Sequence, residues 1–247
     1  AAFYGDYSVP KGIKAILADP NFEAALYKEY NGLIALNVWD EMLRCDMPNG
    51  SNLMRCHIIP SVKPADDGSI EKFKIRLVAD GNTQMYGIDY ERTFSTVVNF
   101  VTIRLCLLLA ASSGYFCTQW DIGQAYLHGK LDSPLYMMMP PGLPSVNAKG
   151  QQVVCRLNRS LYGLKQAGLI WSCVLSASLI AFGMVRCVVD TCLYTISRVC
   201  DDGSTVFIWV LVYVDDLLVI TNNTTYRDEL RAHLLKSFPM THAHAKS

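Results

Sequence analysis

The feature that most constrains the fold is a pair of adjacent carboxylates, Asp215 and Asp216, between two apolar runs. The runs Val206–Val212 and Leu217–Ile220 consist of Val, Ile, Leu and aromatic residues. This composition predicts two buried strands joined by a tight turn. Two adjacent negative charges repel and lose hydration when buried, so the pattern favours a divalent-metal site on a β-hairpin. A solvated, Asp-rich turn explains the same residues, because Asp side chains hydrogen-bond to turn backbone.

Length and composition limit the classes of function. A chain of 247 residues can bury a full core, as one large domain or two subdomains. Its 22 basic and 22 acidic residues cancel, which argues mildly against nucleic acid as a partner, although a basic groove can coexist with acidic faces. The nine Cys include no Cys-x-x-Cys pair, so we expect reduced, mostly buried thiols and no zinc site.

Targeting signals are missing from the sequence. We find no N-terminal signal sequence and no apolar run long enough to span a bilayer, so we expect a soluble, intracellular protein without a membrane partner. His242 and His244 lie in a polar tail, residues 241–247, which suggests no site.

The N-terminal part shows a helix and then a hairpin. Residues 1–20 carry few structural signals and are interpreted as an arm. Phe22–Ala35 has helical spacing, with Asn21 as the N-cap. The pattern from Ser51 to Ser69 is poor, but a turn at Asp67-Gly68 followed by a strand, Ile70–Val78, predicts a hairpin.

Three cations alternate along this predicted strand. Lys72, Lys74 and Arg76 are two residues apart and therefore project from one face. Such a row is either a solvated strand edge or a contact for a triphosphate or nucleic-acid backbone.

A well-delimited helix follows in the middle of the chain. Asn99 can cap a helix over Phe100–Ser113, with Leu105–Leu109 as its buried centre and Gly114 as its end.

The next strand, Phe116–Ile122, contains Asp121, either as a reactive carboxylate at a strand end or as a helix cap. Gly123–Leu127 is expected to turn toward a short helix. The later elements expected are a strand at Tyr136–Met139, a long helix within Leu161–Phe182, and a helix from the capping box Thr225–Asp228 to about Phe238. The order predicts an α+β fold with an antiparallel sheet backed by helices.

Several stretches together match one family, in the order in which that family has them. They are Phe73–Ala79, Gly87–Ser95, Gln119–Gly129, Ser160–Gln166 and Tyr213–Asp216. From about Phe22 to Asn223 the chain resembles the reverse transcriptase of copia-type long-terminal-repeat retrotransposons. The run Leu-Tyr-Gly-Leu-Lys-Gln combined with Tyr-Val-Asp-Asp makes the resemblance highly specific.

The resemblance implies a right-hand polymerase fold, with a palm and a fingers subdomain and a missing or truncated thumb. The reverse transcriptase domain would span 21–240, with fingers at about 21–95 and 130–159. The palm would then take about 96–129 and 160–240.

The resemblance also implies an RNA-directed DNA polymerase, which adds deoxynucleotides to a primer 3′-hydroxyl. Asp121, Asp215 and Asp216 would be catalytic and would hold two Mg²⁺ ions, or Mn²⁺, with the carbonyl of Ile122 as a further ligand. The expected partners are an RNA template, a DNA primer, deoxynucleoside triphosphates and other parts of the retroelement polyprotein. The protein would act in a cytoplasmic virus-like particle or in the nucleus.

Further site residues follow from the same resemblance. Tyr126 falls where reverse transcriptases place an aromatic steric gate against a ribose 2′-hydroxyl, although ordinary helix packing also explains it. The expected nucleotide-binding residues are Lys74, Arg76, Tyr126, Tyr162 and Gly163. The expected template and primer contacts are Lys165, Gln166 and Tyr213.

The sequence departs from the family pattern at several positions. The fingers segment at Asn52–His57 is not recognisable, Asp80 replaces a basic residue, Thr96 replaces Pro, and Gly168-Leu169 replaces Pro-Arg. An alternative function is therefore an inactive, retroelement-derived fragment that keeps the palm fold and binds nucleic acid or protein. Another palm-type nucleotidyltransferase is a third interpretation, against which the run Leu161–Gln166 argues.

Overall fold

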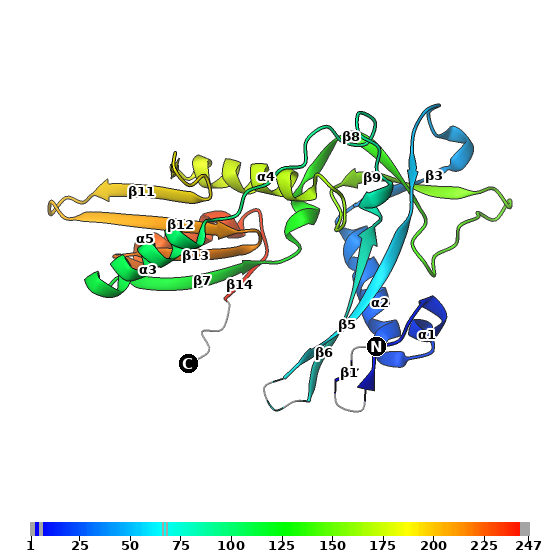
Figure 1. Cartoon of the computed structure of the whole chain (residues 1–247), viewed down its shortest axis with the longest axis horizontal. Helices are drawn as coiled ribbons and strands as arrows, with labels where there is room; N and C mark the ends of the chain where they lie inside the picture. Colours follow the sequence, from blue (N-terminus) through cyan, green and yellow to red (C-terminus); the bar gives the residue numbers. More distant parts are fainter. Residues whose placement is uncertain (1–2, 5–6, 66, 68, 243–247) are drawn as a thin grey trace. The chain divides into compact units, whose positions relative to one another are not determined.

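The computed structural model describes residues 3–4, 7–65, 67 and 69–242 (Figure 1). Contacts divide the chain into two compact units, each made of two stretches of sequence. The first unit comprises Ala1–Thr93 and Gly129–Ala167, and the second comprises Phe94–His128 and Gly168–Ser247. Within the described residues, no helix combines the length and apolar character that crossing a membrane requires.

The first unit contains a four-stranded sheet, a long hairpin and a helix beside the hairpin (Figure 1). The sheet has the order β3-β9-β8-β4, in which only the β4–β8 pairing is parallel. The helices are α1 (Ile13–Leu17) and α2 (Pro20–Ala35), with 3₁₀ turns η1 (Arg44–Asp46) and η2 (Gly81–Thr83). The strands are β1 (Phe3–Tyr4), β2 (Tyr7–Ser8), β3 (Trp39–Leu43), β4 (Leu53–Met54), β5 (Cys56–Pro64), β6 (Ile70–Ala79), β8 (Lys130–Met138) and β9 (Val153–Arg159).

The start of α2 differs from the prediction. Asp19 is the N-cap, because its side chain accepts hydrogen bonds from the backbone N–H groups of Asn21 and Phe22. Pro20 then occupies the first helical position, where its missing N–H costs nothing. The predicted cap, Asn21, lies inside the helix. The segment interpreted as an arm contains α1, whose Ile16 is fully buried.

The hairpin β5–β6 confirms one strand and adds another that the sequence did not predict. β6 shows the expected alternation, with Ile75 and Leu77 buried and Lys74 and Arg76 exposed. β5 crosses the stretch whose pattern was poor and includes Pro60. A two-stranded ribbon tolerates Pro because each strand is also an edge. Of the predicted turn, Asp67 is described and Gly68 lies outside the described residues.

The second unit is built on a six-stranded antiparallel sheet in the order β10-β11-β12-β13-β7-β14 (Figure 1). Helices α3, α4 and α5 contribute buried side chains to the same core as the strands. The elements are α3 (Phe100–Ser113), β7 (Phe116–Ile122), η3 (Ala125–His128), α4 (Ala167–Ala181), β10 (Val185–Arg186), β11 (Leu193–Val199), β12 (Thr205–Tyr213), β13 (Asp216–Thr221), α5 (Thr224–Leu235) and β14 (Met240–His242). The mixed α+β class and the antiparallel sheet agree with the prediction.

Helix α3 has the predicted ends but not the predicted buried centre. Asn99 caps it by accepting from the N–H of Val101 at 2.9 Å, and Gly114 ends it with a φ of 67°. The expected core, however, is largely outside: Leu105 and Leu108 are 55% and 67% exposed. The helix is apolar on nearly every side, so its periodicity could not indicate the face that packs. The fully packed face carries Cys106 and Ala110.

Helices α4 and α5 need smaller corrections. Trp171, Leu175 and Leu179 of α4 are buried as predicted, but Leu164 lies before the helix. The N-cap of α5 is Asn223, whose side chain accepts from the N–H of Tyr226, so Thr225–Asp228 is not the capping box. The helix ends at Leu235, short of the predicted Phe238.

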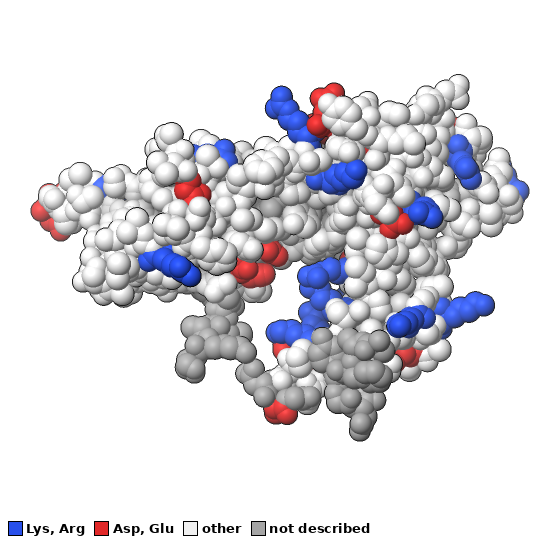
Figure 2. Space-filling model, in the orientation of Figure 1, with Lys and Arg blue, Asp and Glu red and all other residues white. Residues whose placement is uncertain are grey.

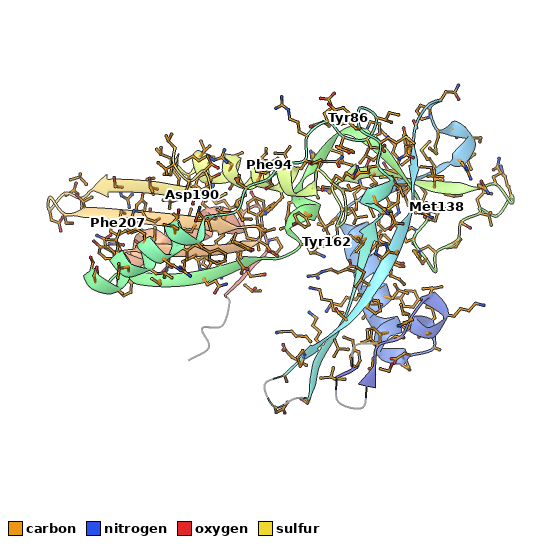
Figure 3. All side chains as sticks on the ribbon, in the orientation of Figure 1. Tyr86, Phe94, Met138, Tyr162, Asp190 and Phe207 are labelled. Atoms are coloured by element: carbon orange, nitrogen blue, oxygen red, sulfur yellow. The ribbon has the colours of Figure 1, made fainter. Side chains whose placement is uncertain are left out.

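The central hairpin is confirmed. Tyr213 pairs with Asp216, which leaves Val214 and Asp215 as the connecting turn between β12 and β13. Aromatic rings of Phe207 and Trp209 pack together on β12, with centroids 4.8 Å apart (Figure 3). Beyond the hairpin, β14 pairs with β7, so Thr241 and His242 belong to the sheet; His244 lies outside the described residues.

The cysteines are less buried than expected. Cys106, Cys155 and Cys192 are buried, whereas Cys45, Cys117 and Cys173 are exposed and the other three are intermediate. The prediction of mostly buried thiols is therefore wrong.

Candidate active site

The pairing of β13 with β7 brings the predicted carboxylates to one end of the sheet. Asp216 lies directly opposite Asp121 in the antiparallel register. Residues in such positions project from the same face, with Cβ atoms about 4.5–5.5 Å apart. Asp215 follows in the turn, and its carbonyl oxygen accepts from the N–H of Ile122 at 3.0 Å. Asp121, Ile122, Asp215 and Asp216 therefore form one local cluster, although they come from segments far apart in the sequence.

Within the described residues, no cationic side chain compensates the negative charges of Asp215 and Asp216. Asp215 is exposed and Asp216 is half-buried. Gln119 donates from Nε2 to Oδ1 of Asp216 at 3.0 Å, which orients that carboxylate. Among the described residues, neither Asp215 nor Asp216 forms an ion pair.

The turn that carries Asp215 has a strained backbone and accepts a hydrogen bond from a side chain of helix α4. Val214 has a φ of 59°, a left-handed conformation that is unfavourable for a β-branched residue. The indole N–H of Trp171 donates to the carbonyl oxygen of Val214 at 2.8 Å. Trp171 itself is buried in the core, so the hydrogen bond ties the turn to a rigid part of α4. The sequence contained no signal for this role of Trp171.

Tyr126 lies close to these carboxylates. It belongs to η3, directly after β7, and is half-buried. Burial raises the pKa of its phenol above the usual value, and the negative charge of Asp215 raises it further. The phenol is thus neutral at physiological pH, and its pKa responds to the charge of Asp215.

The donor chemistry suits a hard divalent cation. Mg²⁺ prefers carboxylate, carbonyl and water oxygens, and this end of the sheet supplies three carboxylates. Within the described residues, however, no group of three or more His, Cys, Asp or Glu side chains is gathered closely enough to hold a metal ion. The fold thus brings suitable ligands to one place without closing them into a finished coordination sphere.

The predicted nucleotide-binding cations lie in the first unit. Lys74 and Arg76 are on the exposed face of β6, and in Figure 2 Lys and Arg side chains lie over the β5–β6 hairpin. The guanidinium of Arg76 is 5.5 Å from the centre of the Tyr162 ring (Figure 3). Arg76 and Tyr162, both predicted to bind nucleotide, are therefore neighbours.

Glu29 of α2 was not predicted and is close to these cations. Its Oε1 accepts from the backbone N–H of Leu77 at 3.2 Å. Burial raises the pKa of Glu29 above its ordinary value, and the Leu77 hydrogen bond and the charges of Lys74 and Arg76 oppose that rise. A carboxylate thus lies beside the cationic row.

The backbone conformation and surroundings of Gly163 require glycine. Its φ is 88°, and a Cβ at this position would lie 2.1 Å from the carbonyl oxygen of Ala79. The neighbouring Tyr162 carbonyl accepts from the N–H of Ala79 at 2.8 Å. The close approach joins the loop after β9 to the end of β6, and it positions Tyr162.

Gln166 and Lys165 are engaged within the first unit. Gln166 is buried; it donates to the carbonyl of Asp89 at 2.8 Å and accepts from Gln84 at 2.9 Å. Lys165 donates from Nζ to the Tyr90 hydroxyl at 3.0 Å. The sequence did not predict that Gln84 and Asp89 are buried and hold Gln166. Nothing in the sequence around these two polar residues indicated burial.

The residues predicted to contact template and primer are divided between the units. Tyr213, at the end of β12 in the second unit, is 45% exposed, while Lys165 and Gln166 belong to the first unit.

Comparison with known proteins identifies the family. The family model described as "Reverse transcriptase (RNA-dependent DNA polymerase)" matches residues 43–246. Retrovirus-related Pol polyproteins from transposons RE2 and RE1 of Arabidopsis thaliana are 36% and 35% identical, each over 88% of this chain and 14% of their own length. The Pol polyprotein from transposon TNT 1-94 of Nicotiana tabacum is 32% identical over 94% of this chain and 17% of its own. The chain thus spans about a sixth or less of these relatives, and it belongs to the reverse transcriptase (RNA-dependent DNA polymerase) family, with relatives in copia-type transposons.

Proposed function

We propose that this chain is the fingers and palm of an RNA-directed DNA polymerase that extends a DNA primer on an RNA template. The first unit would be the fingers and the second the palm. Ser160–Ala167 belong to the first unit by their contacts, whereas the resemblance assigned them to the palm. The observation that carries the proposal is the register of β7 and β13, which places Asp121 opposite Asp216 in a chain of this family.

In this proposal Asp121, Asp215 and Asp216, with the carbonyl of Ile122, hold two Mg²⁺ ions. Bound there, the ions supply a lowered pKa for the primer 3′-hydroxyl and a positive charge that stabilises the transferring phosphoryl group. The chain's own residues position the ligands: Gln119 orients the carboxylate of Asp216, and Trp171 fixes the turn through Val214.

Tyr126 would act as the steric gate for the sugar. Its phenol lies near Asp215, so its ring can collide with a ribose 2′-hydroxyl of a nucleotide bound at the carboxylates. We expect Tyr126→Val to lower the preference for deoxynucleotides over ribonucleotides by about tenfold or more. Tyr126→Phe keeps the ring and should keep the preference. The ratio of kcat/KM for the two substrates measures this, and an unchanged ratio in Tyr126→Val would assign Tyr126 to packing only.

The cationic row of the first unit would bind the triphosphate. Lys74 and Arg76 supply positive charge, and Tyr162 and Gly163 form the adjoining loop. Lys165 and Tyr213 would contact template and primer, whereas Gln166 would hold the loop through Gln84 and Asp89. Arginine suits phosphate because its fork of N–H groups can bind two oxygens.

Primer extension tests the proposal directly. The assay uses an RNA template with an annealed DNA primer, deoxynucleoside triphosphates and Mg²⁺, and it compares the chain with its Asp215→Asn/Asp216→Asn variant. Extension that is lost in the variant, with unchanged circular dichroism, is expected. A folded chain that binds the primer–template but never extends it would contradict the proposal and support the alternative, an inactive binding module.

A further inference from the structure

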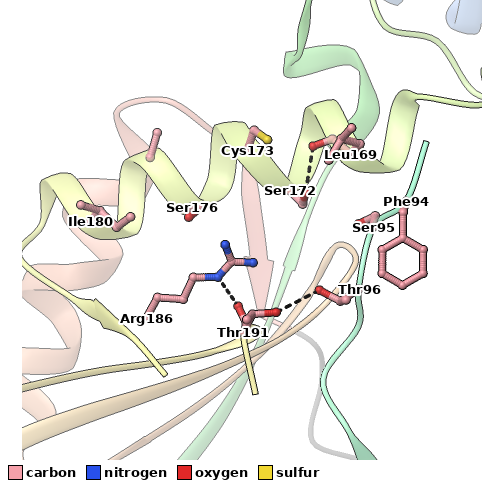
Figure 4. Close-up of a pocket in the computed structure, with 11 residues that line it drawn as sticks. Phe94, Ser95, Thr96, Leu169, Ser172, Cys173, Ser176, Ile180, Arg186 and Thr191 are labelled. Carbon is pink, nitrogen blue, oxygen red and sulfur yellow. Dashed lines mark hydrogen bonds between the residues drawn. The ribbon is translucent and has the colours of Figure 1, made fainter. Parts of the chain in front are cut away.

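The second unit contains a cavity of about 450 Å³ that shares no residue with the proposed active site. It lies between α4, the segment before α3 and the β10–β11 connection (Figure 4). Its volume is within the range of about 300–1,000 Å³ that small-molecule sites occupy. The chemistry of its walls indicates what it can hold.

Arg186 supplies the only charge in the lining. Its Nε donates to the carbonyl of Thr191 at 2.6 Å, and its Cζ is 6.0 Å from the centre of the Tyr194 ring. These contacts hold the guanidinium in place, and Figure 4 shows it directed toward the Ser176 side of the cavity. Among the described residues Arg186 has no ion-pair partner. Its two terminal nitrogens are therefore suited to an oxyanion.

Hydroxyl groups line the same cavity as Arg186. Ser172 and Ser176 are four residues apart and so lie on the same face of α4. Across the cavity the Thr96 and Thr191 hydroxyl oxygens are 3.3 Å apart, and the Thr96 oxygen is also 3.1 Å from the Sγ of Cys192. When Thr96 donates to Thr191, the hydroxyl hydrogen of Thr191 is left to donate to a ligand. Ser172 already donates to the carbonyl of Leu169, which leaves Ser176 as the donor on α4. A guanidinium with neighbouring hydroxyl donors and no carboxylate in the lining is a phosphate-binding chemistry.

Apart from Ser95 and Cys173, the remaining lining is apolar and includes one aromatic ring. Phe94 is 80% exposed at the rim, and Leu169 and Ile180 form part of the walls (Figure 4). An exposed aromatic ring offers a stacking surface to a planar base.

We propose that this cavity binds a nucleoside monophosphate, with the phosphate at Arg186 and the base against Phe94. Two positions at which the sequence departs from the pattern of its family, Thr96 and Leu169, line this cavity. The site is therefore a property of this chain's own residues and is independent of the polymerase proposal.

Isothermal titration of the chain with AMP, in metal-free buffer at physiological ionic strength, tests the site. We expect saturable binding that Arg186→Gln weakens at least tenfold and Arg186→Lys weakens less. Phe94→Ala should weaken AMP severalfold while leaving the affinity for inorganic phosphate unchanged. Arg104→Gln, which removes an exposed arginine of α3 in the same unit, is the matched control and should bind as the parent chain does.

Two further arms locate and identify the ligand. Binding of AMP should persist in Asp215→Asn/Asp216→Asn, because those residues do not line the cavity. No saturable binding of AMP, or binding that Arg186→Gln leaves unchanged in a folded protein, would overturn the proposal. Equal affinity for AMP and inorganic phosphate, with no effect of Phe94→Ala, would overturn the assignment of a nucleotide.

Discussion

The two units differ in how their clustered charges are compensated. At the end of the six-stranded sheet in the second unit, Asp215 and Asp216 lie at a turn where no cation of the described residues forms an ion pair with either. On the β5–β6 hairpin of the first unit, Lys74 and Arg76 have a partly buried carboxylate, Glu29, and an aromatic ring, Tyr162, as neighbours. The two carboxylates therefore keep their negative charge uncompensated, whereas the two cations have a carboxylate of their own unit beside them.

The largest expected effect is the loss of one unpaired carboxylate. Asp216→Asn should lower primer extension by about 1,000-fold, as loss of a group that stabilises transition-state charge does. Its stability should be unchanged, because the variant removes charge repulsion and keeps an acceptor for Gln119. Single-turnover extension and urea unfolding measure the two effects. Asp201→Asn, in an exposed turn of the same unit, is the control; equal losses in both variants would remove the distinction drawn between the turns.

The next largest effect is expected for Gly163, a residue of the first unit whose replacement strains the backbone. Gly163→Ala places a Cβ against the Ala79 carbonyl at a positive φ, so the unfolding free energy should fall by about 3 kcal/mol or more. Gly203→Ala has a similar φ of 79° but meets nothing within 4 Å, and it should cost about 1 kcal/mol. Urea denaturation of both variants measures the difference. Similar losses of unfolding free energy in the two variants would show that the close approach to β6 does not require glycine at position 163.

Removing one cation of the hairpin should affect substrate binding more than the chemical step. Arg76→Ala should raise the KM for deoxynucleoside triphosphate about tenfold, as expected for a lost charge-assisted hydrogen bond. Lys72→Ala, which removes a cation from the same face of β6, should change KM by less than about twofold if that cation is merely solvated. Steady-state kinetics on both variants decide the matter, and an equal rise would indicate a diffuse electrostatic effect.

The smallest effect concerns Glu29 and depends on pH. Its folded pKa is raised above the unfolded value near 4.5, so the folded state retains the proton more strongly. The unfolding free energy therefore falls as pH rises from the unfolded pKa through the folded pKa. Glu29→Gln removes this fall and keeps an acceptor for the N–H of Leu77, so its stability relative to the parent should increase as the pH rises from about 4 to about 7. Urea unfolding at both pH values tests the sign, and a relative loss of stability at the higher pH would show that the carboxylate stabilises the cations instead.

Much of the second unit was predictable because its signals are local. The apolar runs on either side of Asp215 and Asp216 predicted β12 and β13, and Asn99 and Gly114 marked both ends of α3. In the first unit, the alternation along β6 predicted that Lys74 and Arg76 project from one face, and both side chains are exposed there. Each of these features depends on side-chain spacing and on capping chemistry within a few residues.

Other features had no readable local signal. β5 contains two prolines, which usually argue against a strand. They are tolerated because each strand of a two-stranded ribbon has one edge without a hydrogen-bonded neighbour. The cap of α2 moved from Asn21 to Asp19 because both residue types cap equally well and Pro20 fixed the choice. In α3 the apolar side chains cover nearly the whole helix, so the sequence could not show that Leu105 and Leu108 face outward.

By itself the sequence determined the family, the hairpin that carries Asp215 and Asp216, and the strand that carries Asp121. Only the tertiary structure decided that Asp216 lies opposite Asp121, that Trp171 holds the turn, and that Arg186 faces a cavity across from α4. The physical reason is sequence separation. Local patterns report on residues within a turn or two, whereas strand register and side-chain contacts depend on segments that meet only when the core forms.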